Sequence, residues 1–192
     1  RIDRTGAVLE TILPPTKVRY LLGTEDGTKL WVVTERTIFA LSGQAGARVW
    51  TPMIRDVEDY SADGSLEQVL VLRKGRLVVW RPDGEQDLGP ATMVPPFTGE
   101  ANWFALQHED LVVRYERRAG SSSYVKVDEW RLKNVMMLAH VGKMVSAYHN
   151  GRTVTLTNGG GVWDTGPTAM MMMDNDHGIV IVREAGRIDL VE

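Results

Sequence analysis

The amino-acid sequence of 192 residues predicts an all-β fold made from a repeated unit, and two spacing patterns carry this prediction. Arginines that open short apolar runs recur 40, 76 and 35 positions apart, at Arg36, Arg76, Arg152 and Arg187. Prolines recur 37, 38 and 77 positions apart, at Pro15, Pro52, Pro90 and Pro167. Both patterns indicate a period of about 38 residues, with one interval in each set spanning two units. Periods of about 20 to 50 residues are typical of solenoids and propellers.

The first two units each hold four predicted strands, because short β-branched and aromatic runs alternate with turns rich in Gly, Asp and Ser. The runs of the first unit are Lys17–Thr24, Lys29–Glu35, Thr37–Ser42 and Ala47–Thr51. Those of the second unit are Arg55–Ala62, Gln68–Arg73, Arg76–Arg81 and Glu85–Leu88. Asp63-Gly64 and Asp83-Gly84 separate runs of the second unit. Asp-Gly readily adopts the positive φ angles of a type I′ hairpin turn.

The other three units repeat this layout less regularly. The third unit has its runs at Ala91–Pro96, Asn102–His108, Leu111–Arg117 and Tyr124–Trp130. Pro95 and Pro96 weaken the first of these as a strand, because proline cannot donate a hydrogen bond to a neighbouring strand. The fourth unit has its runs at Asn134–Val141, Lys143–His149, Thr153–Thr157 and Val162–Thr165. The fifth has only three, at Ala169–Asp174, Ile179–Arg183 and Arg187–Val191.

The segment before the first unit, Gly6–Leu13, is expected to supply the missing strand of the fifth unit. A ring that pairs one end of the chain with the other leaves no exposed radial edge. The sequence therefore predicts a five-bladed β-propeller with four short antiparallel strands per blade, closed by the N-terminal strand. Residues 1–192 are expected to form this single domain, with blades at about 15–52, 53–90, 91–132, 133–167 and 168–192 plus 6–13.

Composition and charge exclude several classes of function. The net charge of −3 gives no broad basic field, so nucleic-acid contact is possible but not indicated. The chain has no cysteine, which excludes disulfides and cysteine-ligated metals. No apolar run is long enough to span a membrane and no signal peptide opens the sequence, so the expected location is the cytoplasm or a virion. No cofactor is predicted.

The candidate binding residues are Asp174, Asp176 and His177, which follow the innermost predicted strand of the fifth unit. The series Asp174 to Gly178 has some of the oxygen donors of a calcium loop. An EF-hand loop needs glycine at its sixth position and a carboxylate at its twelfth, and here Gly178 stands fifth and Ala185 twelfth. A tight hairpin turn is the simpler interpretation, so no metal site is predicted. No nucleophile motif occurs, and no catalytic residue is assigned.

Three further groups of residues have structural interpretations. The apolar runs Met170–Met173 and Asn134–Ala139 are expected to pack in the core as inner strands, with an adaptable binding surface as the alternative. Tryptophans recur in equivalent strands and are expected to fill the wedges between blades, with ligand stacking as the alternative: Trp31, Trp50, Trp103, Trp130 and Trp163. The basic group Arg114, Arg117 and Arg118 is expected to form a solvated edge.

The segment Leu21–Gly43, with its Gly-Thr-Glu-Asp-Gly-Thr and Leu-Ser-Gly phrases, resembles propeller segments of tailed-bacteriophage virion proteins. The specific resemblance covers about one unit of the five. It implies a structural part of a tail, nozzle or hub that is bound to neighbouring virion subunits. It implies no catalytic residue.

The sequence therefore predicts a non-enzymatic assembly module that docks other protein subunits, although fold alone does not decide function. A carbohydrate-binding propeller is one alternative and would need an equivalent pocket in each unit. A five-bladed glycosidase is the second and would need carboxylates that converge in the channel. A glycan partner is therefore possible, and no membrane partner is expected.

Overall fold

The computed structural model describes residues 5, 8, 11–44, 46–96, 102–141, 144–168, 170–174, 178–183 and 187–191. These residues form five antiparallel sheets, and neighbours in the chain are neighbours in each sheet. The predicted all-β fold with several four-stranded antiparallel sheets is confirmed. No helix in the described ranges is long and apolar enough to cross a membrane.

Three sheets have four strands and two have three in the part of the chain that the structure describes. Sheet one consists of β1 (Tyr20–Gly23), β2 (Leu30–Val33), β3 (Thr37–Ser42) and β4 (Val49–Arg55). Sheet two consists of β5 (Asp59–Ala62), β6 (Val69–Arg73), β7 (Arg76–Arg81) and β8 (Gly84–Pro90). Sheet three consists of β9 (Trp103–His108), β10 (Leu111–Arg117) and β11 (Tyr124–Arg131). Sheet four consists of β12 (Val135–Val141), β13 (Met144–His149), β14 (Arg152–Thr157) and β15 (Gly161–Pro167), with the short 3₁₀ helix η1 (Asn158–Gly160) before β15. Sheet five consists of β16 (Met170–Asp174), β17 (Gly178–Val182) and β18 (Ile188–Val191).

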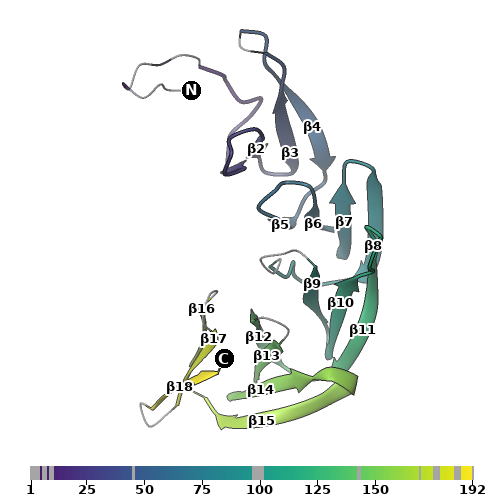
Figure 1. Cartoon of the computed structure of the whole chain (residues 1–192), viewed down its shortest axis with the longest axis vertical. Coiled ribbons are helices and arrows are strands. Elements are labelled where there is room, and N and C mark those ends of the chain that lie inside the picture. The colour runs from purple at the N-terminus through teal and green to yellow at the C-terminus, as the bar shows by residue number, and fades with distance from the viewer. Residues whose placement is uncertain are drawn as a thin grey trace.

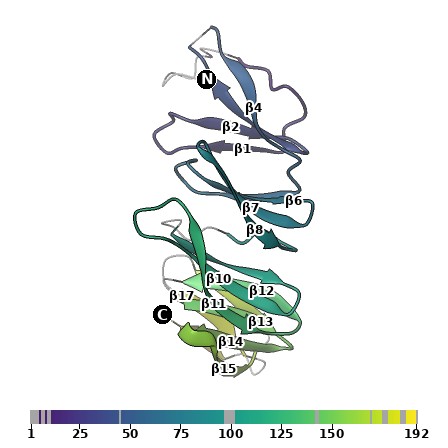
Figure 2. The ribbon, with the colours of Figure 1, turned by 90° about the vertical axis from the view of Figure 1, so that its right-hand side faces the viewer.

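The sheets follow one another along an open arc, with sheet one at one end and sheet five at the other (Figure 1). Figure 2 shows sheets one and two as successive layers along the long axis, above the remaining sheets, which overlap in this view. Their order and meander are those of propeller blades, in which the first strand of each sheet is innermost and the last is outermost.

The predicted closure of the ring is not found among the described residues. There β18 pairs with β17 alone, and no strand of the N-terminal segment joins sheet five. Gly6, Ala7, Leu9 and Glu10 lie outside the described residues. The carbonyl of Leu13 instead accepts a hydrogen bond from the Trp50 indole at 2.9 Å, so this end of the segment lies against the outer strand of sheet one.

The predicted strand Ala91–Pro96 is also wrong, because these residues have no strand pairing. Two features of the chain account for this. The amide of Ala91 is taken by the carbonyl of Gly75, at 3.0 Å, and cannot join a ladder. Pro95 and Pro96 have no amide hydrogen to donate. The described part of sheet three therefore begins at what the sequence predicted as its second strand.

Three hydrophobic clusters fill the spaces between consecutive sheets. Trp31, Val69 and Trp80 belong to the cluster between sheets one and two, where the two indole rings meet edge to face at 5.7 Å. Leu70 and Phe104 belong to the cluster between sheets two and three. The cluster between sheets three and four includes Trp103, Trp130, Val145 and Val154. Because β6 sends Val69 to one cluster and Leu70 to the next, alternate residues of one strand pack against both neighbouring sheets.

The regular spacing of arginine and proline has a structural cause in sheets two and four. The Nε of Arg76 donates to Asp87 Oδ2 at 2.8 Å, and the Nε of Arg152 donates to Asp164 Oδ2 at 2.8 Å. The other oxygen of each carboxylate accepts the amide of the glycine two residues later, at 2.8 Å for Gly89 and 2.7 Å for Gly166. A β-bulge interrupts each strand pair beside this contact. The repeated arginine and Asp-x-Gly-Pro thus mark the same paired bulge in both sheets.

A second repeated contact leads the chain from each sheet to the next. In sheets one to four, a residue just after the outer strand donates its amide to a backbone carbonyl of the same sheet. That carbonyl lies in the β2–β3, β6–β7, β9–β10 or β13–β14 turn. The four donor and acceptor pairs are Val57 to Arg36, Ala91 to Gly75, Leu132 to Asp110 and Thr168 to Gly151, at 2.8 to 3.1 Å. This backbone contact fixes the point at which each following sheet starts.

Candidate functional site

One face of the arc carries the turns between first and second strands and between third and fourth strands of the four-stranded sheets, and the β10–β11 turn of sheet three. Because the strands of a meander alternate in direction, these two kinds of turn leave every sheet on the same side. We call this side the turn face. Three cavities in the described part of the chain lie on the turn face of sheets one to three.

A cavity of about 730 Å³ lies between the first turns of sheets one and two. Asp26 organises the turn of sheet one: its Oδ1 accepts hydrogen bonds from the Thr24 hydroxyl at 2.5 Å and from the Thr28 amide at 3.0 Å. These hydrogen bonds, that from Thr24 first, lower the pKa of Asp26 to about 2. Asp26 is therefore ionised at neutral pH, and its carboxylate serves the turn itself.

Asp63 organises the corresponding turn of sheet two in a related way. Its Oδ1 accepts the amides of Glu67 at 3.0 Å and Gln68 at 3.2 Å, and its Oδ2 accepts the Ser65 hydroxyl at 2.6 Å. Lys29 of sheet one then donates to the Ser65 carbonyl at 3.1 Å and pairs with the Glu67 carboxylate. The two turns are thus internally braced and linked across the sheet boundary.

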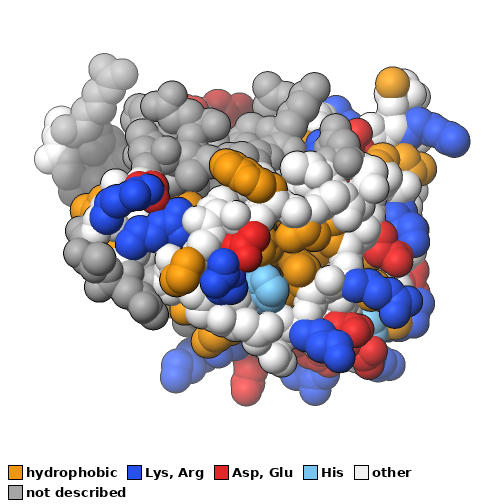
Figure 3. Space-filling view, turned by 90° about the horizontal axis from the view of Figure 1, so that it is seen from below, with side chains coloured by type: hydrophobic (Ala, Val, Ile, Leu, Met, Phe, Trp, Pro, Cys, Tyr) orange, Lys and Arg blue, Asp and Glu red, His pale blue; other side chains and the backbone are white. Residues whose placement is uncertain are grey.

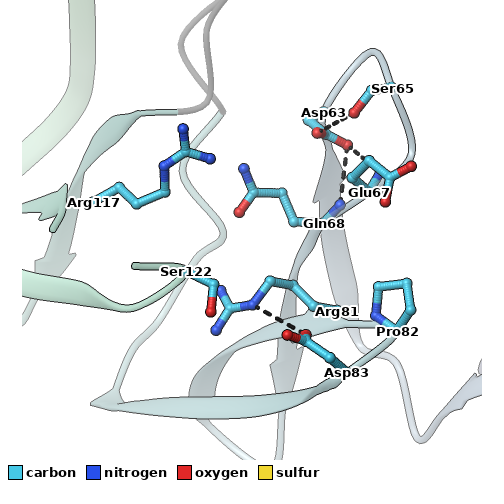
Figure 4. Close-up of a pocket in the computed structure, with 9 residues that line it drawn as sticks. All are labelled: Asp63, Ser65, Glu67, Gln68, Arg81, Pro82, Asp83, Arg117 and Ser122. Carbon is cyan, nitrogen blue, oxygen red and sulfur yellow. Dashed lines mark hydrogen bonds and ion pairs between the residues drawn. The ribbon is translucent and has the colours of Figure 1, made fainter. Parts of the chain in front are cut away.

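A second cavity, of about 500 Å³, lies between sheets two and three, and we call it the Arg81 cavity (Figure 4). The first turn of sheet two, the β7–β8 turn and the β10–β11 turn line it. The lining residues are Asp63, Ser65, Glu67, Gln68, Arg81, Pro82, Asp83, Arg117 and Ser122. A third cavity, of about 440 Å³, continues along the β10–β11 turn and shares Arg117 and Ser122 with the second.

Arg81 is the most buried cation of the Arg81 cavity, with 14% of its side chain exposed. Its Nε lies 3.7 Å from Asp83 Oδ1, which is too long for a hydrogen bond. Both Nε and Nη1 are buried and have no hydrogen-bond partner. Arg117 is exposed and, within the described ranges, its guanidinium has no hydrogen bond or ion pair. Figure 4 shows both guanidinium groups pointing into the cavity, beside Gln68 and Ser122.

The floor of the Arg81 cavity is braced by contacts between sheets two and three. The buried Tyr124 hydroxyl donates to Gln68 Oε1 at 3.0 Å, and burial raises the pKa of Tyr124, which keeps the phenol protonated. Gln86 Nε2 donates to the Tyr124 carbonyl at 2.7 Å, and Gln86 Oε1 accepts the Tyr124 amide at 2.9 Å. The walls of the cavity are therefore held by both sheets.

Of the three binding residues that the sequence singled out, Asp174 is the one whose backbone the structure describes. Asp174 ends β16 and pairs with Gly178, so it stands where the chain enters a first turn, on the turn face of sheet five. Asp176 and His177 lie outside the described residues. The binding role of these three residues stays a prediction. Among the described residues, no cluster of His, Cys, Asp and Glu could hold a metal.

The predicted solvated edge of arginines is wrong for Arg114, which is only 4% exposed. Its guanidinium lies 4.8 Å from the centre of the Trp103 ring and pairs with Glu116. Tyr115 faces the other way, stacks on Phe104 and donates to the Leu88 carbonyl at 3.1 Å. Arg117 and Arg118 are exposed, as expected. The sequence analysis did not single out Arg81, although Arg81 directly precedes the Pro82-Asp83-Gly84 turn that holds it at the cavity.

The tryptophan prediction holds only in part, and the side chains of Met170–Met173 lie outside the described part of the structure. Trp31, Trp103 and Trp130 are buried between sheets, but Trp163 on β15 is 61% exposed. Figure 3 shows the end of the molecule that carries β15, where hydrophobic side chains lie among charged side chains of both signs. Met136 on the inner strand β12 is 72% exposed. Core packing is therefore wrong for Met136.

Comparison with known proteins supports the fold only. No family model and no curated protein matches the chain. A eukaryotic initiation factor structure has a TM-score of 0.61 at 10% identity, with 94% of this chain and 53% of that chain covered. Hsv2p of Kluyveromyces lactis has a TM-score of 0.55 at 12% identity, covering 91% and 60%. A chain of an S. cerevisiae complex, in which dbp5 is bound to nup159 and gle1, has a TM-score of 0.55 at 10% identity, covering 89% and 60%.

The chain thus spans between half and three fifths of the length of these structures. At 10 to 12% identity the likeness concerns shape alone. Nothing in these comparisons points to bacteriophage proteins. The order of the sheets, their meander topology and these likenesses together identify the chain as β-propeller-like in fold.

Proposed function

We propose that this chain is a non-enzymatic docking module that binds other protein subunits through its turn face. The observation that carries the proposal is the construction of that face. Its turns are braced by Asp26, Asp63 and Lys29 and stand on sheets that pack tightly against one another. A surface that is already ordered loses little conformational entropy on binding, and this favours recognition of a partner.

The fold comparisons add support from one protein complex. The S. cerevisiae structure that resembles this chain contains dbp5 bound to nup159 and gle1. Propeller-like folds therefore occur in assemblies of several proteins. Because the identity is 10%, this likeness supports protein docking as a class and assigns no partner to this chain.

Two alternatives remain as outcomes of the test. A glycan-binding propeller would need equivalent pockets, yet the first turns of sheets one and two differ in residues and in hydrogen bonding. A glycosidase would need two carboxyl groups flanking a sugar bond. In the Arg81 cavity, Asp63 accepts hydrogen bonds from its own turn and Glu67 pairs with Lys29, so neither carboxylate is poised for that chemistry.

The docking proposal is tested by reversing charge on the turn face. Arg117→Glu with Arg118→Glu changes two exposed turn-face residues. Arg36→Glu with Lys74→Glu makes the same change in charge on the opposite face. Lysates of the source cells are passed over each immobilised chain, candidate partners are identified by mass spectrometry, and binding of each purified candidate is measured by calorimetry.

We expect purified partners to bind the original chain and the opposite-face control, and to bind the turn-face variant at least tenfold more weakly. Equal binding by both variants would contradict the proposed face. A glycan array with a hydrolysis assay completes the test. Binding or cleavage of a glycan, without a protein partner, would replace docking by one of the two alternatives.

A place in a bacteriophage virion is a narrower form of this proposal. It rests on the phrase Leu21–Gly43 alone. Detection of the chain by mass spectrometry in purified phage particles would support it, and its presence only outside particles would refute it.

A further inference from the structure

The Arg81 cavity has more hydrogen-bond donors than its own walls can use. Burying a charged nitrogen without a hydrogen bond is costly, and such atoms in a native structure call for a missing partner. Arg81 has two of them, Nε and Nη1, and no other described residue has more than one. Arg117 adds a guanidinium without a hydrogen bond or ion pair within the described ranges.

The acceptors of the Arg81 cavity are already engaged. Asp63 accepts two amides and a hydroxyl. Glu67 pairs with Lys29. Asp83 lies 3.7 Å from Arg81 Nε and is 74% exposed, so water screens its charge. An occupant that satisfies the two arginines must therefore bring its own acceptor oxygens.

The charge balance decides which kind of acceptor fits. The cavity is surrounded by three cations and three carboxylates: Arg81, Arg117 and Lys29, and Asp63, Glu67 and Asp83. A singly charged carboxylate gains the hydrogen bonds of a guanidinium, whose flat donor array matches its two oxygens. A phosphate would bring about two negative charges against three carboxylates, so the surroundings favour the carboxylate.

We propose that the Arg81 cavity binds a carboxylate of the docked protein, on an acidic side chain or at a C-terminus, through Arg81 and Arg117. This site rests on the proposed docking function and gives the turn face one charged anchor point. Gln68 lines the cavity and accepts a hydrogen bond from Tyr124 behind it, and Ser122 places a hydroxyl beside Arg81 (Figure 4). Because both sheets two and three supply walls, the site requires the two sheets to pack as the structure shows.

The test uses a small probe and the arginine side chains themselves. N-acetyl-glutamate amide, which is a blocked glutamate, is titrated into the ¹⁵N-labelled chain at constant ionic strength, and the Nε–Hε signals of the arginines are followed by NMR. N-acetyl-glutamine amide is the uncharged control, and inorganic phosphate is a separate titration. We expect the blocked glutamate to shift the signals of Arg81 and Arg117 and the glutamine control to shift neither.

Variants make the assignment specific. Arg117→Gln removes an exposed side chain and should fold normally, so it avoids the risk of losing the fold with Arg81. Arg118→Gln, in the same turn but outside the Arg81 cavity, is the matched control. We expect Arg117→Gln to weaken binding of the blocked glutamate about tenfold, as the loss of a charge-assisted hydrogen bond implies, and Arg118→Gln to leave it unchanged.

Equal shifts with the glutamine control, or no shift at Arg81 and Arg117, would overturn the site. Shifts with phosphate but not with the blocked glutamate would overturn its assignment to carboxylates. Failure of the docking function has a different signature. The probe would still bind at Arg81 and Arg117, but no purified protein partner would distinguish the turn-face variant from its opposite-face control.

Discussion

At the residue scale, aspartates shape the local backbone of this chain. Asp26 and Asp63 accept amides within first turns, while Asp87 and Asp164 join a strand arginine to a glycine amide at a bulge. The hydrogen bond from Arg76 lowers the pKa of Asp87, and that from Arg152 lowers the pKa of Asp164. These four carboxylates are thus structural, because backbone amides donate hydrogen bonds to their oxygens.

Asp26 should make the stability of the chain sensitive to acid. Its pKa is about 2 in the folded chain, below its ordinary value of 3.8. A carboxylate with a lowered folded pKa stabilises the fold fully above the unfolded pKa, and this contribution is lost as the pH falls through the folded pKa. We expect Asp26→Asn to lower the free energy of unfolding clearly at neutral pH and much less near pH 2, as measured by urea denaturation.

Glu25→Gln is the matched control, because Glu25 is the exposed neighbour of Asp26 and its carboxylate has no hydrogen bond in the described ranges. It should change stability little at either pH. If Asp26→Asn had the same effect at both pH values, the hydrogen-bonded carboxylate would not be the cause.

The role of a residue could be predicted from the sequence only where that role depends on its neighbours in the chain. The turns at Asp63-Gly64 and Asp83-Gly84 could be placed between strands from local composition alone. The Arg81 cavity was not, because it combines a turn of sheet two with Arg117, and only the packing of sheets two and three joins them. Arg114 was misplaced for the same reason: its position over Trp103 depends on the register between β9 and β10.

At the element scale, the strands were the most predictable feature. Short runs rich in β-branched and other apolar residues, bounded by turn residues, identify β6, β7, β10 and β14 closely. In β6 the apolar run is continuous, because this strand packs on both faces. The run Ala91–Pro96 failed because two prolines and a diverted amide prevent pairing. Hydrophobicity alone could not reveal that contact, since the carbonyl that takes the amide belongs to Gly75 in the preceding sheet.

The bulge of sheet two gives the second prediction. Gly89 has a φ of 106°, and a methyl group added at its Cα would meet only open space, so replacing it tests the backbone angle alone. We expect Gly89→Ala to lower the free energy of unfolding by about 1 kcal/mol or more, because an L-residue is strained at this angle. Gly64→Ala is the control: its surroundings are equally open and its φ is not in the left-handed region.

Gly64→Ala should leave stability unchanged or raise it by about 0.4–1 kcal/mol, through the smaller entropy of the unfolded chain. Both variants are measured by urea denaturation under identical conditions. Equal effects at the two positions would mean that the bulge geometry at Gly89 carries no special cost.

At the scale of the whole molecule, the protein is a series of sheets, and each sheet packs against the sheets that precede and follow it in the chain. Stability in such a series is approximately a sum of terms for each unit and each interface. Sheet two has an apolar cluster on both sides, formed with sheet one and with sheet three. The inner strand β1 of sheet one has mostly exposed residues, including Tyr20 and Leu21. The closed ring predicted from the strand count would have given both sheets similar surroundings.

Hydrogen exchange should therefore be graded along the arc. We expect the amides of β6, which lie between two buried clusters, to exchange far more slowly than those of β1, because β6 opens only when both of its interfaces are disrupted. Exchange followed by mass spectrometry on peptides from residues 20–33 and 69–81 measures both regions in one experiment. In an arc, sheet one can open while sheets two and three stay packed, so the first peptide should reach full exchange in a separate, earlier step. Simultaneous exchange of both peptides would instead indicate one cooperative unit, as expected of a closed ring. That result would support the ring closure by Gly6–Leu13 that was predicted from the sequence.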